Sequence, residues 1–170
     1  MNQPKTKTVT ILLTRYSDLF SNFLYVISKK GYTHASLSLD ENDENFYSFN
    51  VKGFTIEKPK KRISRKRKAG SVCIRLQVSE EAHHILETLM KQFVENKTKY
   101  TYSKLGVFLC LIRIAHKFDN AYFCSQFVAE MLHISNAVSL SKDASLYLPN
   151  ELIEELKKTP QTPEFSFDLI

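Results

Sequence analysis

The chain has 170 residues, 43% of them hydrophobic and 25% charged, a balance typical of one soluble globular domain. Twelve Phe and eight Tyr can fill a core without tryptophan, and four glycines, none in a GxGxxG or GxxxxGK[ST] pattern, argue against a glycine-cradled nucleotide site. The formal charge of +6 comes from one segment, because residues 58–68 hold eight of the 24 Lys and Arg, and the rest of the chain is slightly acidic.

No targeting or membrane-spanning segment is apparent. The N-terminal residues are polar, and the longest apolar run, 105–111, is too short to span a bilayer. Cys73, Cys110 and Cys124 are odd in number and widely spaced, which disfavours a disulfide framework, and no CxxC or HxxxH pair suggests zinc. We therefore expect a single cytoplasmic domain over residues 1–170 that needs no metal or cofactor. The sequence leaves its oligomeric state open.

The first half of the chain predicts a strand, a helix and a hairpin. Residues 9–14 are a β-rich apolar run, and Ser17 then caps a helical pattern that stops at Gly31. Apolar and polar side chains alternate over residues 34–40, which indicates a half-buried strand with His34 on its polar face. Residues 46–51 predict the partner strand, and the basic segment 58–68 follows as an exposed loop or a strand edge.

The second half predicts one further strand and four helices. Residues 70–79 alternate as a strand, and Ser79 caps a long amphipathic helix that follows it. The other helices cover residues 105–115, expected to be largely buried, residues 123–132, which begin with Cys124 in the first turn, and a short segment that starts at Pro149. The tail after this last helix is expected to be irregular.

Cys124 is the most informative residue because it opens a predicted helix. Its sulfur there lies near the positive end of the helix dipole and near several free backbone N–H groups, which favour a nucleophilic thiolate. The same N–H groups can receive the oxyanion of a tetrahedral intermediate. On position alone, a buried structural cysteine is the alternative, since free cysteines are often core residues.

His34 is the natural base for such a thiol, because it begins a strand on the polar face. A thiol nucleophile needs an imidazole within hydrogen-bond reach, itself oriented by a third polar group. On the partner strand, Ser48 or Asn50 is placed to orient His34, and Ser36 and Asp40 on its own strand are further options. The alternative is that His34 only caps or fills the preceding turn.

Two other histidines lie near Cys124 in the sequence. His133 is at the far end of the Cys124 helix, about 13 Å away at 1.5 Å per residue, so it cannot act as the base. His116 precedes a predicted turn and stays open as a candidate.

The order of these motifs resembles the circularly permuted papain-fold group, the NlpC-like and lecithin:retinol acyltransferase-like hydrolases and transferases. In that group the histidine strand precedes the cysteine helix. Its histidine followed by small and apolar residues matches residues 34–37 (HASL), and its helix opening of the type F-C-S-x-F-V matches residues 123–128 (FCSQFV). Its later proline before a short helix matches Pro149, and a Tyr-x-Tyr before the cysteine helix matches Tyr100 and Tyr102.

The resemblance implies an α+β, papain-like domain in which a small antiparallel sheet packs against a helical layer. The Cys124 thiolate would attack an amide or ester carbonyl, and His34 would protonate the leaving group and later activate water. Relatives commonly carry His, Glu, Asn or Gln where this chain has Ser48, so either Asn50 serves or Cys124 and His34 work as a dyad. We expect the substrate to contact Tyr16, Tyr100, Tyr102, Tyr122 and Ser125.

Hydrolysis of an amide bond in a peptide or peptide-like substrate is the leading hypothesis. A lipid acyltransferase or thioesterase of the same fold is the rival, because the apolar residues 105–115 could line a groove. The other class is a non-catalytic binding module that docks an anionic partner, nucleic acid or a membrane surface, through residues 58–68. That segment holds no aromatic residue to stack a base, and a solvated loop is the plainer interpretation.

Overall fold

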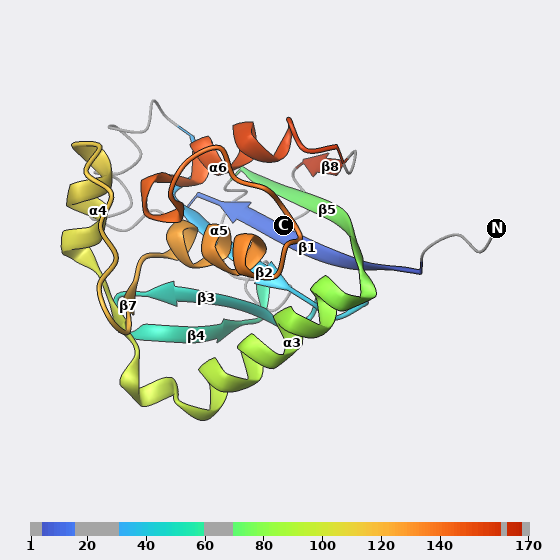
Figure 1. Ribbon diagram of the computed structural model, residues 1–170, viewed down its shortest axis with the longest axis horizontal. Coiled ribbons are helices and arrows are strands. Elements are labelled where there is room, and N and C mark those ends of the chain that lie inside the picture. Colours follow the sequence, from blue (N-terminus) through green and yellow to red (C-terminus); the bar gives the residue numbers. More distant parts are fainter. Residues whose placement is uncertain (1–4, 16–30, 60–69, 161–162, 168–170) are drawn as a thin grey trace.

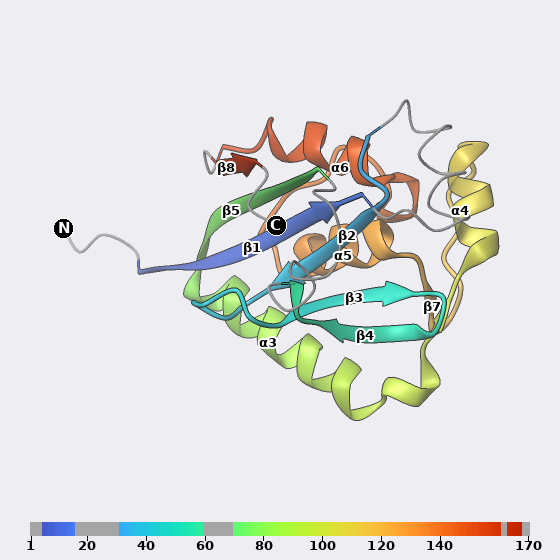
Figure 2. The same cartoon turned by 180° about the vertical axis from the view of Figure 1, so that it is seen from behind.

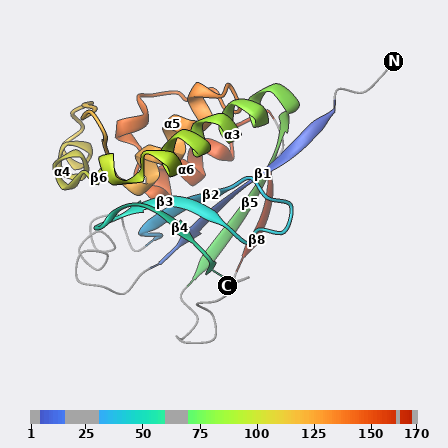
Figure 3. The same cartoon turned by 90° about the horizontal axis from the view of Figure 1, so that it is seen from below.

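One antiparallel sheet and a layer of helices make up the computed structural model, which describes residues 5–15, 31–59, 70–160 and 163–167. The strands, in spatial order, are β4 (Gly53–Glu57), β3 (Phe46–Asn50), β2 (His34–Ser38), β1 (Thr6–Thr14), β5 (Ser71–Ser79) and β8 (Glu164–Phe167). Helices α3 (Glu80–Glu95), α5 (Cys124–Ile134) and α6 (Pro149–Leu156) cover one face of the sheet (Figures 1 and 3). The predicted α+β class, with an antiparallel sheet against a helical layer, is confirmed.

A smaller group of elements lies at one end of the molecule. The short strands β6 (Thr101–Tyr102) and β7 (Ala121–Tyr122) pair in parallel, and α4 (Lys104–Leu111) stands beside them at the left edge of Figure 1. The 3-10 turns η1 (Lys97–Lys99) and η2 (Ala144–Leu146) complete the described elements. Because β7 leads directly into α5, this group fixes where the Cys124 helix begins.

The main core lies between the sheet and the helices, since alternate residues of each strand point to the helical side. On β1 these are Val9, Ile11 and Leu13, and the neighbouring strands and helices supply further fully buried side chains: Ala35, Leu37, Phe49, Val72, Ile74, Leu76, Leu86, Phe127, Val128 and Leu132. The alternation predicted for residues 34–40 and 70–79 therefore places their apolar side chains against the helices, as expected.

The opposite face of the sheet is also buried, but it is more polar. Leu12, Phe46 and Cys73 form a small apolar cluster there. Around it lie the buried polar side chains of this face, Thr10, His34, Ser36, Ser38 and Ser48. The polar face predicted for the His34 strand is thus not a solvent face, and its side chains must find hydrogen-bond partners inside the protein.

Several predicted helix boundaries are confirmed, with the physical reasons given for them. The Ser79 hydroxyl accepts a hydrogen bond from the Ala82 backbone N–H at 3.1 Å, which caps α3. Cys124 is the first residue of α5, and Pro149 occupies the first turn of α6.

Three expectations about the fold were wrong. The tail forms a strand, β8, which pairs with β5 from Arg75 to Val72. The segment after Asn50 turns back at Gly53, whose φ of 96° suits glycine, and forms the unpredicted strand β4. The third concerns the helix expected over residues 105–115, since α4 ends at Leu111 and is exposed along one side, not largely buried.

Two predictions lie outside the described residues. The helix expected between Ser17 and Gly31 falls almost wholly in the undescribed range 16–30, which also contains Tyr16. Of the basic segment 58–68, only Lys58 and Pro59 are described.

Candidate functional site

Cys124 begins α5 immediately after β7, at the end of the sheet where β2 also begins (Figures 1 and 2). Its side chain is 4% exposed. The residue before it, Phe123, is the N-cap and has an aromatic side chain that cannot accept hydrogen bonds from the first N–H groups of the helix. Among the described residues, nothing accepts from the backbone N–H groups of Cys124 and Ser125. The helix therefore presents uncapped donors beside the thiol.

Ser125 adds a further polar group at the same point. Its hydroxyl is completely buried, and it has no hydrogen-bond partner in the described part of the chain. A buried hydroxyl without a partner costs free energy, so such groups are uncommon in folded proteins. Ser125 was predicted to contact substrate, but no part of it is exposed at the protein surface.

Phe123 anchors the start of α5. Its ring is buried against Val107 and Cys110 of α4 and against Leu148, which precedes α6. Its backbone N–H donates to the Gln126 side-chain oxygen at 3.5 Å. These contacts hold the start of α5 against α4 and the residue that precedes α6. The packing of Phe123 therefore fixes the backbone next to Cys124.

His34 is buried at the first position of β2, where it pairs with a carboxylate that the sequence analysis missed. Its Nε2 lies 3.1 Å from Oε2 of Glu57, the last residue of β4, and both side chains are buried. A buried carboxylate fixes the orientation of an imidazole and stabilises its charged form.

The two residues predicted to orient His34 make other bonds. The Ser48 hydroxyl donates to the backbone carbonyl of Ala35 at 2.6 Å, which ties β3 to β2. The Asn50 side-chain oxygen accepts from the backbone N–H of Lys52 at 2.9 Å and shapes the turn into β4. Both are structural contacts, and the orienting carboxylate comes from one strand further along the sheet.

Cys124 and His34 lie at one end of the sheet but belong to different sides of it. Ala35 points into the core beneath α5, so the alternation of β2 turns His34 to the opposite face. Glu57 confirms that direction, because it pairs across the strands with Phe46 of the cluster on that face. Within the described residues, no hydrogen bond joins the Cys124 sulfur to the His34 ring.

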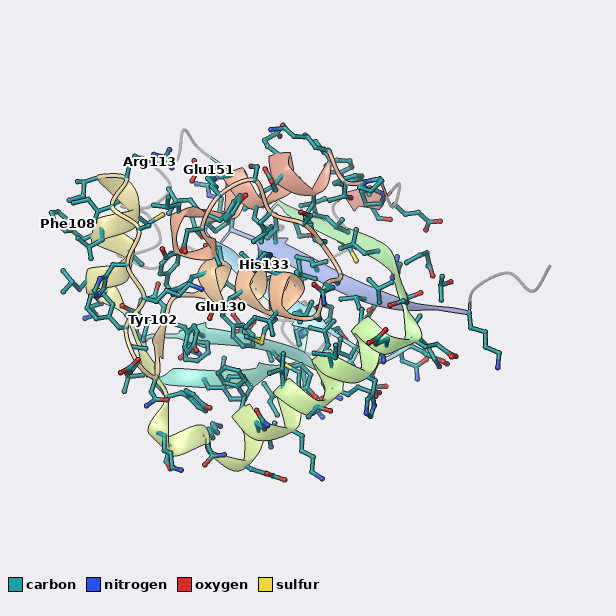
Figure 4. All side chains as sticks on the ribbon, viewed as in Figure 1. Tyr102, Phe108, Arg113, Glu130, His133 and Glu151 are labelled. Atoms are coloured by element: carbon teal, nitrogen blue, oxygen red, sulfur yellow. The ribbon has the colours of Figure 1, made fainter. Side chains whose placement is uncertain are left out.

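The predicted tyrosines gather near the start of α5 as parts of an aromatic cluster. The Tyr100 ring lies 4.4 Å from that of Phe93, and the Tyr122 ring lies 5.1 Å from that of Phe49. Burial, with a smaller contribution from the Glu130 carboxylate, raises the pKa of Tyr122 to about 12. Tyr102 is half-buried and touches both this cluster and that of Phe123. Figure 4 shows Tyr102 between α4 and the sheet.

His133 is not placed as a base for Cys124, and no described contact joins His116 to Cys124. His133 is exposed in the last turn of α5, at the opposite end from Cys124, as predicted. His116 is exposed and packs edge-on against Phe118 at 4.3 Å, and its backbone N–H donates to Ser145.

A polar hollow lies near β7, lined by Lys117, Phe118, Asp119, Asn120, Tyr122 and Glu130. Neither Cys124 nor His34 lines it. Lys117 lies 3.5 Å from the Glu130 carboxylate, whose pKa is raised by burial in spite of that cation. The hollow is therefore separate from the cysteine and histidine positions.

The three cysteines are free thiols, and all three are buried. Burial raises the pKa of Cys73, and it raises that of Cys110 to about 11. Both thiols are thereby kept protonated near neutral pH. No set of three or more His, Cys, Asp or Glu side chains in the described ranges could hold a metal ion. None of the helices described there is long and apolar enough to cross a bilayer.

Comparison with known proteins gives a similar fold and no family. No family model and no curated protein matches the chain. Among solved structures, it is similar to the metalloprotein yiiX of Escherichia coli O157:H7, described as DUF1105, with a TM-score of 0.50 and 15% identity. The match covers 96% of this chain and 89% of that one. At this identity the similarity concerns the fold alone.

Proposed function

We propose that the protein is a thiol hydrolase of permuted papain-like architecture, with Cys124 as nucleophile, His34 as base and Glu57 as the carboxylate that orients His34. The observation that carries the proposal is the start of α5, where a cysteine, uncapped N–H groups and a buried hydroxyl without a partner occur together. His34, the first residue of β2 at the same end of the sheet, is buried and paired with the Glu57 carboxylate. Nucleophile, oxyanion donors, base and orienting group are the parts that acyl transfer through a thiol requires.

The proposed reaction is the hydrolysis of an amide bond in a peptide or peptide-like substrate. The Cys124 thiolate attacks the carbonyl carbon, and the protonated His34 gives its proton to the leaving amine as the C–N bond breaks. Water, deprotonated by His34, then attacks the thioester, and a carboxylic acid and the free thiol are released. The N–H groups of Cys124 and Ser125 would stabilise the oxyanion in both steps.

The proposal requires the His34 ring to turn from its own face of the sheet toward Cys124, because no hydrogen bond joins the two side chains in this structure. Catalytic hydrogen bonds often form only in the substrate complex. The decisive quantity is therefore the change in the reactivity of Cys124 when His34 is replaced.

Alkylation by iodoacetamide near neutral pH, followed by peptide mass spectrometry, measures that quantity. We expect Cys124 to react at least about tenfold faster than Cys73 and Cys110, which burial keeps protonated. H34Q should slow Cys124 about tenfold. H83Q is the matched control, since His83 is also buried but lies on α3. Equal labelling of the three thiols, or equal effects of the two variants, would overturn the proposal.

Two observations support other functions. The exposed apolar side of α4, which packs against Phe123, favours a lipid acyl substrate over a peptide-like one. The burial of Cys124 and its lack of a bond to an imidazole favour a non-catalytic binding module. A panel of peptide anilides and acyl-lipid esters, assayed with wild type and C124S, separates the three: only an enzyme shows turnover that C124S abolishes.

A further inference from the structure

The outer side of α4 and the turn that follows it expose an unusual number of large apolar side chains. The described residues expose nine such side chains in all, and four of them lie within residues 105–114. These are Leu105 at 55%, Phe108 at 55%, Ile112 at 49% and Ile114 at 51% exposure. The other five are distributed over β3–β4, α3, α5 and β8. An exposed apolar patch of this kind marks a surface that binds something.

This exposure belongs to a helix that is firmly attached to the body of the protein. On the inner side of α4, Val107 and Cys110 pack against Phe123 and Leu148. The Ser103 hydroxyl caps the helix by accepting from the Gly106 backbone N–H at 3.0 Å. With its inner side packed and its first turn capped, α4 presents its outer apolar side in a fixed direction.

The chain on either side of α4 carries an excess of positively charged residues. Residues 96–118 include five Lys and Arg and no Asp or Glu. These cations, all exposed, are Lys97, Lys99, Lys104, Arg113 and Lys117. Arg113 and Lys117 lie near carboxylates of α6 and α5, whereas Lys104, in the first turn of α4, has no carboxylate partner among the described residues. The surface is therefore apolar and basic together.

The shape of this surface fits a lipid bilayer better than another protein. α4 lies at the end of the molecule, and its labelled side chain Phe108 points outward while Arg113 lies at the top of the helix near Glu151 (Figures 1, 3 and 4). Exposed Leu, Phe and Ile side chains with Lys and Arg beside them supply the two contributions that bind a protein to a membrane surface, burial of apolar area and attraction to anionic lipids. A second copy of the chain would bring the same cations face to face, which is unfavourable.

We infer that α4 and residues 112–114 form a docking surface for an anionic lipid bilayer. The apolar side chains enter the boundary between headgroups and acyl chains, while Lys104, in the first turn of α4, lies against lipid phosphates. Because Phe123 packs on the inner side of α4, docking would hold the start of α5 near the bilayer. The inference stands apart from the chemistry of Cys124, since it depends only on the surface of α4.

A tryptophan placed in α4 tests the insertion directly, because the chain has no tryptophan of its own. F108W is the probe, and F167W is its matched control, since Phe167 is 60% exposed on β8, far from α4 in Figure 1. With vesicles of phosphatidylcholine containing about 30% phosphatidylserine, the emission of F108W should shift to shorter wavelength and be quenched by brominated lipids. The emission of F167W should not change.

Vesicle co-sedimentation of the full chain measures the energetic contribution of the patch. F108S combined with I112N should lower binding to the same vesicles about tenfold or more, because two apolar side chains that would be buried in the bilayer are lost. F167S combined with I134N removes a matched pair exposed to 60% and 46% and should leave binding unchanged. K104Q, compared with K91Q on α3, should weaken binding and reduce its dependence on salt.

The inference is overturned if wild type does not bind these vesicles, or if the two double variants lose binding equally. It is also overturned if F108S with I112N changes only the self-association of the protein, measured by light scattering, or only the binding of a protein. Circular dichroism of each variant establishes that the loss is not one of folding. Labelling of Cys124 by iodoacetamide in the same variants keeps this inference distinguishable from the proposed thiol chemistry.

Discussion

Helices α5 and α4 are both rich in apolar residues, yet the protein uses them in opposite ways. From Cys124 to Leu132, every residue of α5 is buried, because the sheet covers one side and α3, α6 and η2 lie around the rest. α4 buries only Gly106, Val107 and Cys110 and turns Leu105 and Phe108 to the outside. Apolar composition therefore does not determine burial. What determines it is the number of neighbouring elements available to cover the helix.

The difference separates a helix that holds the fold together from a helix that is free to bind. Deep burial of α5 fixes its first residue, Cys124, in one place, which a nucleophile requires. Partial burial of α4 leaves apolar side chains exposed among the described residues.

Removing a core ring from α5 should have the largest effect on stability. Phe127 is completely buried and its ring lies 5.1 Å from that of Phe93 and 5.2 Å from that of Phe49, so F127A should lower the free energy of unfolding by about 3–5 kcal/mol. F108A in α4 should change it by less than about 0.5 kcal/mol. Urea denaturation measures both. Similar losses in the free energy of unfolding for the two variants would show that Phe108 is buried in the folded protein.

Breaking the ion pair beneath β2 should have the next largest effect, because α5 packs on the other face of that strand. E57Q removes the charge that pairs with His34 inside the protein and should cost about 3 kcal/mol. E44Q is the control, since Glu44 is exposed, and should be neutral within about 0.5 kcal/mol.

A double-mutant cycle with H34Q and E57Q isolates the coupling between the two side chains. A coupling energy well above the experimental error is expected. If the single variants are additive, the bond between Nε2 and the carboxylate does not contribute to the fold, and the role of Glu57 as an orienting group loses its basis.

The elements that the sequence predicted well are those with a strong local signal. Ser79 and the glutamates after it predicted the start of α3, and Pro149 predicted the start of α6. The alternation of residues 34–40 gave the two faces of β2 correctly. Each of these signals is contained in one short stretch of chain and needs no knowledge of what packs against it.

What the sequence did not predict depends on partners far away in the chain. Glu57 was missed because β4 runs into the basic segment and carries only a short alternation, so its carboxylate is found only once β4 pairs with β3. Strand β8 was missed because its pairing with β5 is the reason it is extended. The relation of Cys124 to His34 depends on which face α5 covers, a property of the assembled sheet.

A methyl group added to Gly106 should have a moderate effect, because Gly106 lies at the contact between α4 and Phe123. A Cβ there would meet the Ser103 hydroxyl at 2.6 Å and the Phe123 ring at 3.3 Å, so the cap must shift. We expect G106A to cost about 1–2 kcal/mol in spite of its better helix propensity. A Cβ at Gly70 would meet no atom of the described residues within 4 Å, so G70A is the control. A stabilised G106A would mean that α4 is loosely held, which would weaken the argument for a fixed docking surface.

The smallest expected effect concerns the bond that ties the segment after α4 to α6. Burial acts to raise the pKa of Glu151, but the Leu148 backbone N–H and the side chains of Arg113 and Lys142 outweigh it and hold this pKa below its usual value. A carboxyl whose pKa is lowered by folding adds stability above its unfolded pKa of about 4.3, and this stability is lost as the pH falls through the folded value. The free energy of unfolding of wild type should therefore exceed that of E151Q by at most about 1 kcal/mol at pH 7, because Arg113 is largely exposed and solvent screens its charge.

The gap between wild type and E151Q should close as the pH falls below about 4, because the protonated carboxyl then resembles the amide. Urea denaturation at pH 7, 5 and 3.5 measures the gap, and E154Q is the control, since Glu154 pairs with Lys157 at the surface and should give no more than a few tenths of a kcal/mol. A gap that persists at low pH would assign the effect to packing and not to charge. The ion pair between Arg113 and Glu151 would then not fix the position of residues 112–114. In that case α4 should bind a bilayer as strongly at pH 4 as at pH 7, provided that the charge of the lipid is held constant.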